Sequence, residues 1–283
     1  MTIDQLYANI CKKRSMLCVG LDVDYDRLPE KLKFECRRGD MALAGKLYSG
    51  NARAVVSFNK AIIDATAPYA VAYKPNLAFY EALGMDGVRA LAGTVGYIRD
   101  RYPDMFLIAD AKRGDIGNTA RMYAKTFFET LDFDAATLAP YMGRDTVEPF
   151  LQYPGKYAIV VALSSNKSSA DYQRLDVGGK PLYQKVMEAM MEFSTPDNMM
   201  FVVGATNAQD FSKVRSFCPD NFLLVPGVGA QGGDAQSVIK YGANSRGGLL
   251  INSSRAILYA SSEPDFAKAA AEVAKNTAPY EPR

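Results

Sequence analysis

The stretch "LIADAKRGDIGNTA", Leu107 to Ala120, places an apolar run directly before a group of charged residues. The run has the length and composition of a buried β-strand. Asp110 and Lys112 are two residues apart, so on a strand their side chains leave the same face. An unpaired charge is costly to bury, so a buried strand carries such residues at its end and in pairs. The stretch therefore predicts a buried strand that ends in a charged site.

Apolar runs of strand length recur along the chain, with helix-like segments between them. We predict eight strands, near residues 15–24, 70–76, 105–112, 134–140, 157–165, 200–206, 222–230 and 247–254. Their near-continuous apolar character favours parallel strands that helices cover. The segments between them carry apolar residues at helical spacing. Eight alternations over 283 residues predict an α/β fold of the (β/α)8 type, a TIM barrel, with a doubly wound open sheet as the alternative.

We expect the chain to form a single domain over residues 1–283. The segment at about 25–57 follows the first strand and is too long for a simple loop, so it is expected to be a helical insertion. No repeat, low-complexity tract or linker indicates a second domain.

The composition argues against several classes of function. The 33 basic and 31 acidic residues are mixed along the chain and give a net charge of +2, so we expect no nucleic-acid or membrane partner. No apolar run reaches the length of about 18 residues that a membrane span needs. The chain has no histidine, which rules out a Ser-His-Asp mechanism. The four cysteines show no metal-like spacing, so we expect reduced thiols, no metal site and a cytoplasmic location.

Polar residues gather where the predicted strands end, which is where barrels of this kind carry their active sites. These residues are Asp22 after the first strand, Lys74 after the second, Asp110 and Lys112 in the third, Ser164 and Ser165 after the fifth, and Arg255 after the eighth. Asp110, Lys112, Asp115 and Lys74 would form an array of alternating charge, in which the carboxylates favour the cationic form of Lys112. A purely structural network of salt bridges is the alternative.

The glycine-rich turn "PGVGAQGGD", residues 226–234, follows the seventh strand. Glycines let backbone N–H groups approach an anion closely, and Gln231 and Arg255 add side-chain donors. The loops after strands 7 and 8 are the common phosphate site of these barrels. We therefore expect a phosphorylated small molecule whose reacting part lies over strands 2 and 3.

Several motifs, in order, resemble one enzyme family over nearly the whole chain. "LIADAKRGDIGNTA" matches the DxKxxD-I-x-x-T signature of orotidine 5'-phosphate decarboxylase. "KPNLAFYE", "PYMGRDTVEPF", "VVGATN", "VPGVGAQGGD" and "INSSRAILYA" are similar to the longer, bacterial-type branch of that family. In "LSSNKSS" the chain departs from the branch, with Lys167 where proline is common.

The resemblance implies a reaction without a cofactor, the decarboxylation of orotidine 5'-monophosphate to UMP in the last step of pyrimidine nucleotide synthesis. It makes Lys112 the proton donor, which Asp110 and Lys74 hold in place. It also implies a homodimer with shared sites. The remaining implied roles are Asp115 near the substrate carboxylate, Ile116 and Thr119 acting with it from the partner subunit, Asp22 on a ribose hydroxyl, Ser165 on the pyrimidine, and Gln231 with Arg255 on the phosphate.

Two other functions stay open at this point. Metal-dependent sugar-phosphate lyases share the DxKxxD spacing, but such relatives are expected to carry a carboxylate where this chain has Lys74, whose cation would repel magnesium. A catalytically silent nucleotide-binding barrel is the second alternative, and the complete set of charged residues argues against it.

Overall fold

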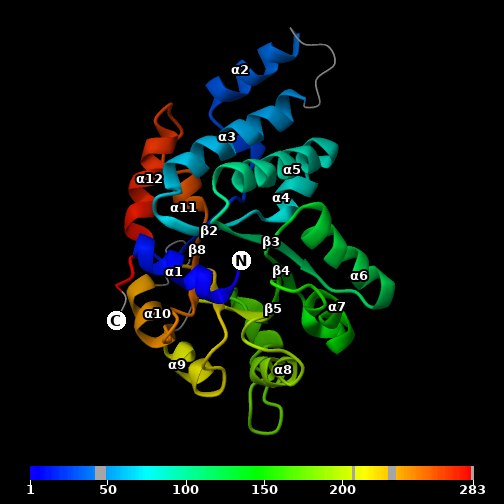
Figure 1. Cartoon of the computed structure of the whole chain (residues 1–283). Coiled ribbons are helices and arrows are strands. Elements are labelled where there is room, and N and C mark those ends of the chain that lie inside the picture. Colours follow the sequence, from blue (N-terminus) through cyan, green and yellow to red (C-terminus); the bar gives the residue numbers. More distant parts are fainter. Residues whose placement is uncertain (42–48, 206–207, 229–233, 282–283) are drawn as a thin grey trace.

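Eight parallel strands form a closed barrel in sequence order, with β1 hydrogen-bonded to both β2 and β8 (Figure 1). The computed structural model describes residues 1–41, 49–205, 208–228 and 234–281. The strands are β1 (Leu17–Gly20), β2 (Ala70–Lys74), β3 (Phe106–Arg113), β4 (Ala135–Leu138), β5 (Tyr157–Leu163), β6 (Met199–Val203), β7 (Leu223–Val225) and β8 (Leu249–Ser253). The predicted (β/α)8 barrel is confirmed. The open-sheet alternative is wrong, because an open sheet leaves two edge strands unpaired.

Burial explains why the strands read as continuous apolar runs. Every residue of β1, β2, β4, β6, β7 and β8 is buried. Inward side chains fill the barrel and outward ones pack beneath the helices, so neither face favours a polar residue. Lys74 at the end of β2 and Asn252 near the end of β8 are therefore exceptions to the pattern of their strands.

Helices alternate with the strands around the outside of the barrel. The main ones are α3 (Gly50–Thr66), α5 (Gly84–Arg101), α6 (Gly117–Lys125), α7 (Glu148–Leu151), α8 (Leu182–Met191), α9 (Ala208–Phe217), α10 (Ala235–Gly242) and α12 (Phe266–Thr277). Shorter pieces lie in the connections: α4 (Leu77–Glu81), α11 (Arg255–Leu258), η2 (Thr126–Thr130), η3 (Pro140–Met142), η4 (Arg144–Thr146) and η5 (Lys167–Asp171).

The connection from β1 to β2 is helical. It contains η1 (Tyr25–Arg27), α2 (Glu30–Met41) and α3. Ser49 caps α3, because its side chain accepts a hydrogen bond from the Ala52 N–H. In Figure 1, α2 lies along α3 and reaches beyond the barrel wall. No helix in the described part of the chain is both long and apolar enough to cross a membrane.

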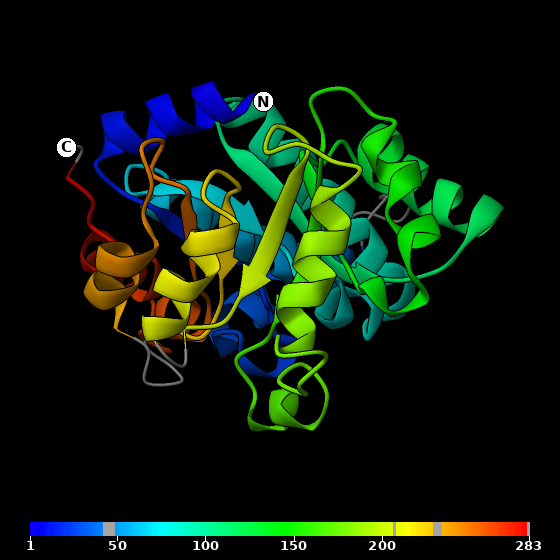
Figure 2. The ribbon, with the colours of Figure 1, turned by 90° about the horizontal axis from the view of Figure 1, so that it is seen from below.

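The two ends of the barrel differ. Helix α1 (Ile3–Lys13) lies across the end where the strands begin, in front of the barrel in Figure 1. The Met16 N–H donates to the Ala278 carbonyl over 3.1 Å, which ties the C-terminal segment to the same end. Figure 2 shows the excursion after β5 projecting from the opposite end, toward which the strands run. Lys74, Asp110 and Lys112, which the sequence analysis singled out, lie where β2 and β3 run toward that open end.

Candidate active site

Three predicted residues form one ion-pair network at the carboxyl ends of β2 and β3. The Lys74 ammonium donates to Oδ2 of Asp110 over 2.7 Å, and the Lys112 ammonium donates to Oδ1 of the same carboxylate over 2.5 Å. The two lysines differ in accessibility, since the side chain of Lys74 is 4% exposed and that of Lys112 is 53% exposed. Lys74 is thus part of the packed interior, and Lys112 offers its ammonium group to the open end.

The network shifts the ionisation of its buried members in opposite directions. Burial alone would raise the pKa of Asp110, but the positive charges of Lys74 and Lys112 outweigh it and hold that pKa well below its usual value. Burial alone would lower the pKa of Lys74, but the carboxylates of Asp110 and Asp22 outweigh it and raise that pKa. Both groups are therefore charged throughout the neutral range.

Thr137 on β4 completes this network, and the sequence analysis missed it. Its hydroxyl donates to Oδ1 of Asp110 over 3.0 Å and accepts the Lys112 N–H over 2.9 Å. The backbone of Lys112 has a φ of 45°, in the left-handed region that residues other than glycine avoid. Strain of this kind persists only where surrounding contacts hold it. Thr137 supplies such a contact and fixes both the carboxylate and the lysine backbone.

Asp22 lies beside the network on the neighbouring strand end. Its Oδ1 is 3.9 Å from the Lys74 ammonium, and this buried oxygen accepts no hydrogen bond within the described part of the chain. Tyr259 fixes the backbone there, because its hydroxyl donates to the Asp22 carbonyl over 3.2 Å and accepts the Asp24 N–H over 2.7 Å. The guanidinium of Arg27 lies 3.6 Å from the centre of the Tyr259 ring. Asp22 is thus a rigidly placed acceptor for a ligand hydroxyl.

Asp115 and Thr119 form no hydrogen bond or ion pair with the network in the described part of this chain. Oδ1 of Asp115 accepts the Ile116 N–H over 2.8 Å, and Asp115 forms no ion pair with any residue that the structure describes. Gly114 lets the chain turn tightly after β3, because a Cβ there would lie 2.8 Å from the Ala139 carbonyl oxygen. Thr119 is exposed on α6. The network and these two residues are therefore separate parts of the predicted site.

Ser164 and Ser165 follow β5, and two neighbours fix them. The side chain of Gln173, from the excursion after β5, accepts the Ser164 N–H over 2.7 Å and donates to the Ser164 hydroxyl over 2.9 Å. Gly204, at the end of β6, packs so closely that a Cβ there would lie 2.7 Å from the Cα of Ser165. The sequence analysis named the serines and missed both of these supports.

The expected phosphate residues are only partly described. Arg255 is exposed at the first position of α11, directly after β8. Gln231 lies outside the described residues. Helix α11 is one short turn that begins at Arg255, and Tyr259 follows its last residue. Since Tyr259 hydrogen-bonds the Asp22 carbonyl, this turn links the predicted phosphate contact to the segment that carries Asp22.

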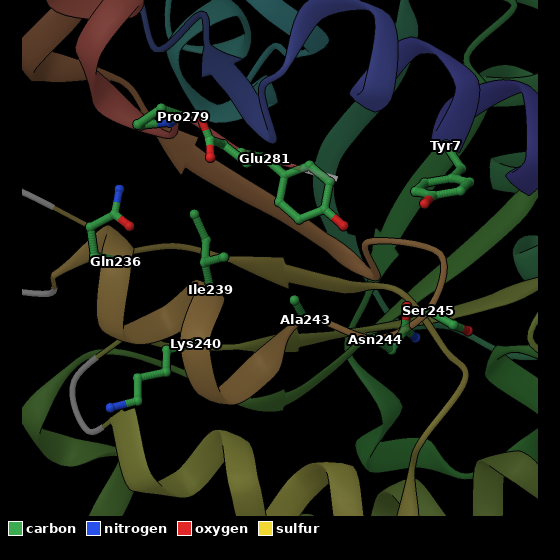
Figure 3. Close-up of a pocket in the computed structure, with 10 residues that line it drawn as sticks. Tyr7, Gln236, Ile239, Lys240, Ala243, Asn244, Ser245, Pro279 and Glu281 are labelled. Carbon is green, nitrogen blue, oxygen red and sulfur yellow. The ribbon is translucent and has the colours of Figure 1, made fainter. Parts of the chain in front are cut away.

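A groove of about 830 Å³ lies elsewhere, between α10, α1 and the C-terminal segment (Figure 3). Figure 3 shows Gln236, Ile239 and Lys240 of α10 on one side and Pro279 and Glu281 on the other. This groove contains none of the predicted site residues. Its size therefore does not make it a candidate for the chemistry, which depends on the charged network at the other end.

The network can stabilise negative charge and deliver a proton. An accessible ammonium held in a fixed position stabilises charge that develops beside it, without reorganisation during the reaction. Asp110 holds that ammonium by a hydrogen bond, and Lys74 holds the other oxygen of Asp110. Within the described residues no group of three or more cysteine, aspartate or glutamate side chains is arranged to hold a metal ion, and the chain has no histidine.

Comparisons with known proteins show the family of this chain. A model of the "Orotidine 5'-phosphate decarboxylase / HUMPS family" matches residues 15–272. The orotidine 5'-phosphate decarboxylase of Phocaeicola vulgatus is 52% identical over 276 residues, which cover 97% of this chain and 96% of the relative. That of Christiangramia forsetii is 53% identical over 270 residues, which cover 95% of this chain and 93% of the relative.

Solved structures give the same result. The chain superposes on OMP decarboxylase of Leishmania donovani with a TM-score of 0.76 and 34% identity, covering 98% of each chain. It superposes on orotidine 5'-monophosphate decarboxylase of Plasmodium berghei with a TM-score of 0.82 and 26% identity, covering 97% of this chain and 96% of the other. The chain therefore belongs to the orotidine 5'-phosphate decarboxylase / HUMPS family.

Proposed function

We propose that this chain catalyses the decarboxylation of orotidine 5'-monophosphate to UMP and carbon dioxide, the last step of UMP synthesis. The observation that carries the proposal is the pairing of one accessible lysine, Lys112, with a buried carboxylate and a second, buried lysine. Relatives at about 50% identity bear the name of this enzyme. The sugar-phosphate lyase alternative is not favoured.

The chemistry follows from the charges. When the bond between C6 of the pyrimidine and its carboxylate breaks, the electron pair stays on C6 and carbon dioxide leaves. The ammonium of Lys112 stabilises the developing charge and donates its proton to C6, and solvent then reprotonates the amine. Asp110 and Lys74 hold Lys112 in position. No metal or cofactor takes part in this scheme.

The rest of the nucleotide is bound around the open end of the barrel. Asp22 accepts a hydrogen bond from a ribose hydroxyl, which suits its buried Oδ1, since that oxygen accepts no hydrogen bond from the described residues. Ser165 binds the pyrimidine, and Arg255 with Gln231 binds the phosphate. In this proposal the whole chain, 1–283, acts as one domain in the cytoplasm, where free thiols such as those of its four cysteines stay reduced.

The direct test follows the loss of orotidine 5'-monophosphate absorbance with the purified protein. We expect turnover that survives EDTA, since no step uses a metal. Loss of activity on chelation would instead support the lyase class. UMP binding without turnover would support a silent barrel. A Lys112→Ala variant is the matched control, and it should bind UMP but lose turnover, because the proton donor acts in the transition state.

We further propose a homodimer in which Asp115 and Thr119 serve the partner's site. Their separation from the network of their own chain motivates this. Exposed apolar side chains lie on the same segment and on a nearby one: Ile116 and Met122 at α6, and Tyr141 and Met142 on η3, which contacts the η4 turn packed against α6. An exposed apolar patch of this kind is typical of an interface. An isologous dimer would bury two copies of it.

A mixing experiment tests the shared site. Lys112→Ala and Asp115→Ala homodimers should each be nearly inactive. In a hybrid dimer both defects fall in one site, and the other site is intact. Random exchange at equal amounts makes about half of the dimers hybrid, with one working site of two, so activity should return to about a quarter of wild type. Verified exchange without recovery would show that Asp115 acts in its own chain.

A further inference from the structure

Asn252 of β8 is a buried polar side chain that the proposed function does not use. It is 8% exposed, and its Oδ1 is fully buried. This oxygen forms no hydrogen bond with any residue that the structure describes. A buried amide without partners destabilises a folded protein relative to an apolar side chain of the same shape. A hydrogen-bond donor beyond the described residues, such as a ligand, would remove this cost.

The strand register places this amide inside the barrel, one layer below the open end. Asn252 pairs with Cys18 of β1, so the two side chains lie on the same face of the sheet. Two residues further along β1, on that same face, Gly20 pairs with Lys74. The face of Asn252 is therefore the one from which Lys74 reaches Asp110.

Gly20 places no side chain over the amide. A Cβ at position 20 would lie 3.2 Å from Oδ1 of Asn252 and 2.7 Å from Cβ of Ser254. Any side chain there would lie over the carboxamide, between it and the layer of Lys74. With glycine at this position, no side chain of residue 20 separates the carboxamide from the layer of Lys74.

The neighbours of Asn252 define what it can bind. Asp22 is two residues beyond Gly20 on the adjacent strand, and it is the proposed ribose contact. Arg255 is three residues beyond Asn252 in the chain, and it is the proposed phosphate contact. A neutral carboxamide both donates and accepts hydrogen bonds, which suits the hydroxyl and ester oxygens between those two groups.

We propose that Asn252 is a further substrate-binding residue, whose carboxamide hydrogen-bonds the ribose 5'-phosphate portion of the nucleotide, directly or through one water molecule. The proposal rests on the proposed function for the identity of the nucleotide. It explains why an amide oxygen with no hydrogen-bond partner among the described residues lies in the buried strand β8.

The test compares Asn252→Leu with a matched control, Asn221→Leu. Asn221 is also buried but has partners, since it donates to the Met199 carbonyl over 2.9 Å and accepts from the Cys218 thiol. We expect Asn252→Leu to raise the melting temperature and to lower kcat/KM by at least 10-fold. We expect Asn221→Leu to lower the melting temperature and to leave kcat/KM within twofold of wild type.

Ligand binding locates the contact. The Asn252→Leu change should weaken the binding of UMP and the binding of ribose 5-phosphate by similar factors. It should leave the inhibition constant of inorganic phosphate unchanged. If Asn252→Leu fails to fold, Asn252→Ser and Asn252→Ala replace it. The serine variant should then bind UMP more tightly than the alanine variant, because serine keeps a hydroxyl that can form a hydrogen bond. UMP affinity and kcat/KM within twofold of wild type would overturn the proposal. If the wild type bound UMP but did not turn over orotidine 5'-monophosphate, the proposed function would fail and the binding measurements would still test Asn252.

Discussion

The Lys74→Met substitution tests the charged network most directly. The Lys74 ammonium lies 2.7 Å from Asp110 and 3.9 Å from Asp22. At an effective dielectric constant near 20, these separations correspond to gross attractions of about 6 and about 4 kcal/mol, which the desolvation of Lys74 largely offsets. Removing one partner of a buried pair typically costs about 3–5 kcal/mol, because the other charge stays buried without compensation. We expect a loss of that size in the free energy of unfolding at pH 7.

The pH dependence of that loss has a definite sign. Asp110 has a lowered pKa in the folded protein, so its stabilising effect is present above the pKa of the unfolded state and is lost as the pH falls through the folded value. Without Lys74, burial raises the folded pKa of Asp110 above that of wild type. Below this new pKa the variant takes up a proton that wild type does not, and the difference in stability shrinks by about 1.4 kcal/mol per pH unit. Lys74, with its raised pKa, stays charged over this range.

Urea unfolding followed by circular dichroism at a series of pH values from 7 down to 4 measures this difference. Glu281→Gln is the control, because it removes an exposed ion pair with Arg14 and should change the midpoint little at any pH. A Lys74→Met/Asp110→Asn double variant should be more stable at pH 7 than Lys74→Met alone. A stability loss no larger than that of the control, or one that grows as the pH falls, would refute the reasoning.

Three further changes test the supports of the site. Tyr259→Phe removes the hydroxyl that fixes the Asp22 backbone and should lower kcat/KM about 10-fold, the effect of about one hydrogen bond, whereas Tyr97→Phe on the outer helices should not. Gly204→Ala should displace Ser165 and raise KM, whereas Gly96→Ala, where a Cβ meets no atom within 4 Å, should leave KM unchanged. Burial raises the pKa of the Cys18 thiol to about 12, so mass spectrometry after native iodoacetamide treatment at pH 8 should find Cys18 unmodified, while denatured protein is labelled there.

The barrel and the centre of the site could be predicted because both depend on short-range patterns. Continuous apolar runs of strand length indicate parallel strands covered on both sides, and eight of them fill one barrel. The two-residue spacing of Asp110 and Lys112 places them on one face whatever the details of packing. Lys74 joins them because the carboxyl ends of neighbouring parallel strands lie at the same end of a barrel, and the 2.7 Å contact follows from that arrangement.

The supports of the site depend on contacts between distant segments, which leave little trace in the sequence. Thr137 is an ordinary residue for a strand, and only the register of β4 against β3 brings its hydroxyl to Asp110. Tyr259 reads as one more aromatic residue, although it fixes a loop more than 230 positions earlier in the chain. Asn252 is visible in the sequence as a polar residue in an apolar run, but its lack of partners is visible only in the folded structure. A polar residue inside a buried strand is therefore the sequence signal to pursue, and its hydrogen bonds decide whether it serves the fold or the ligand.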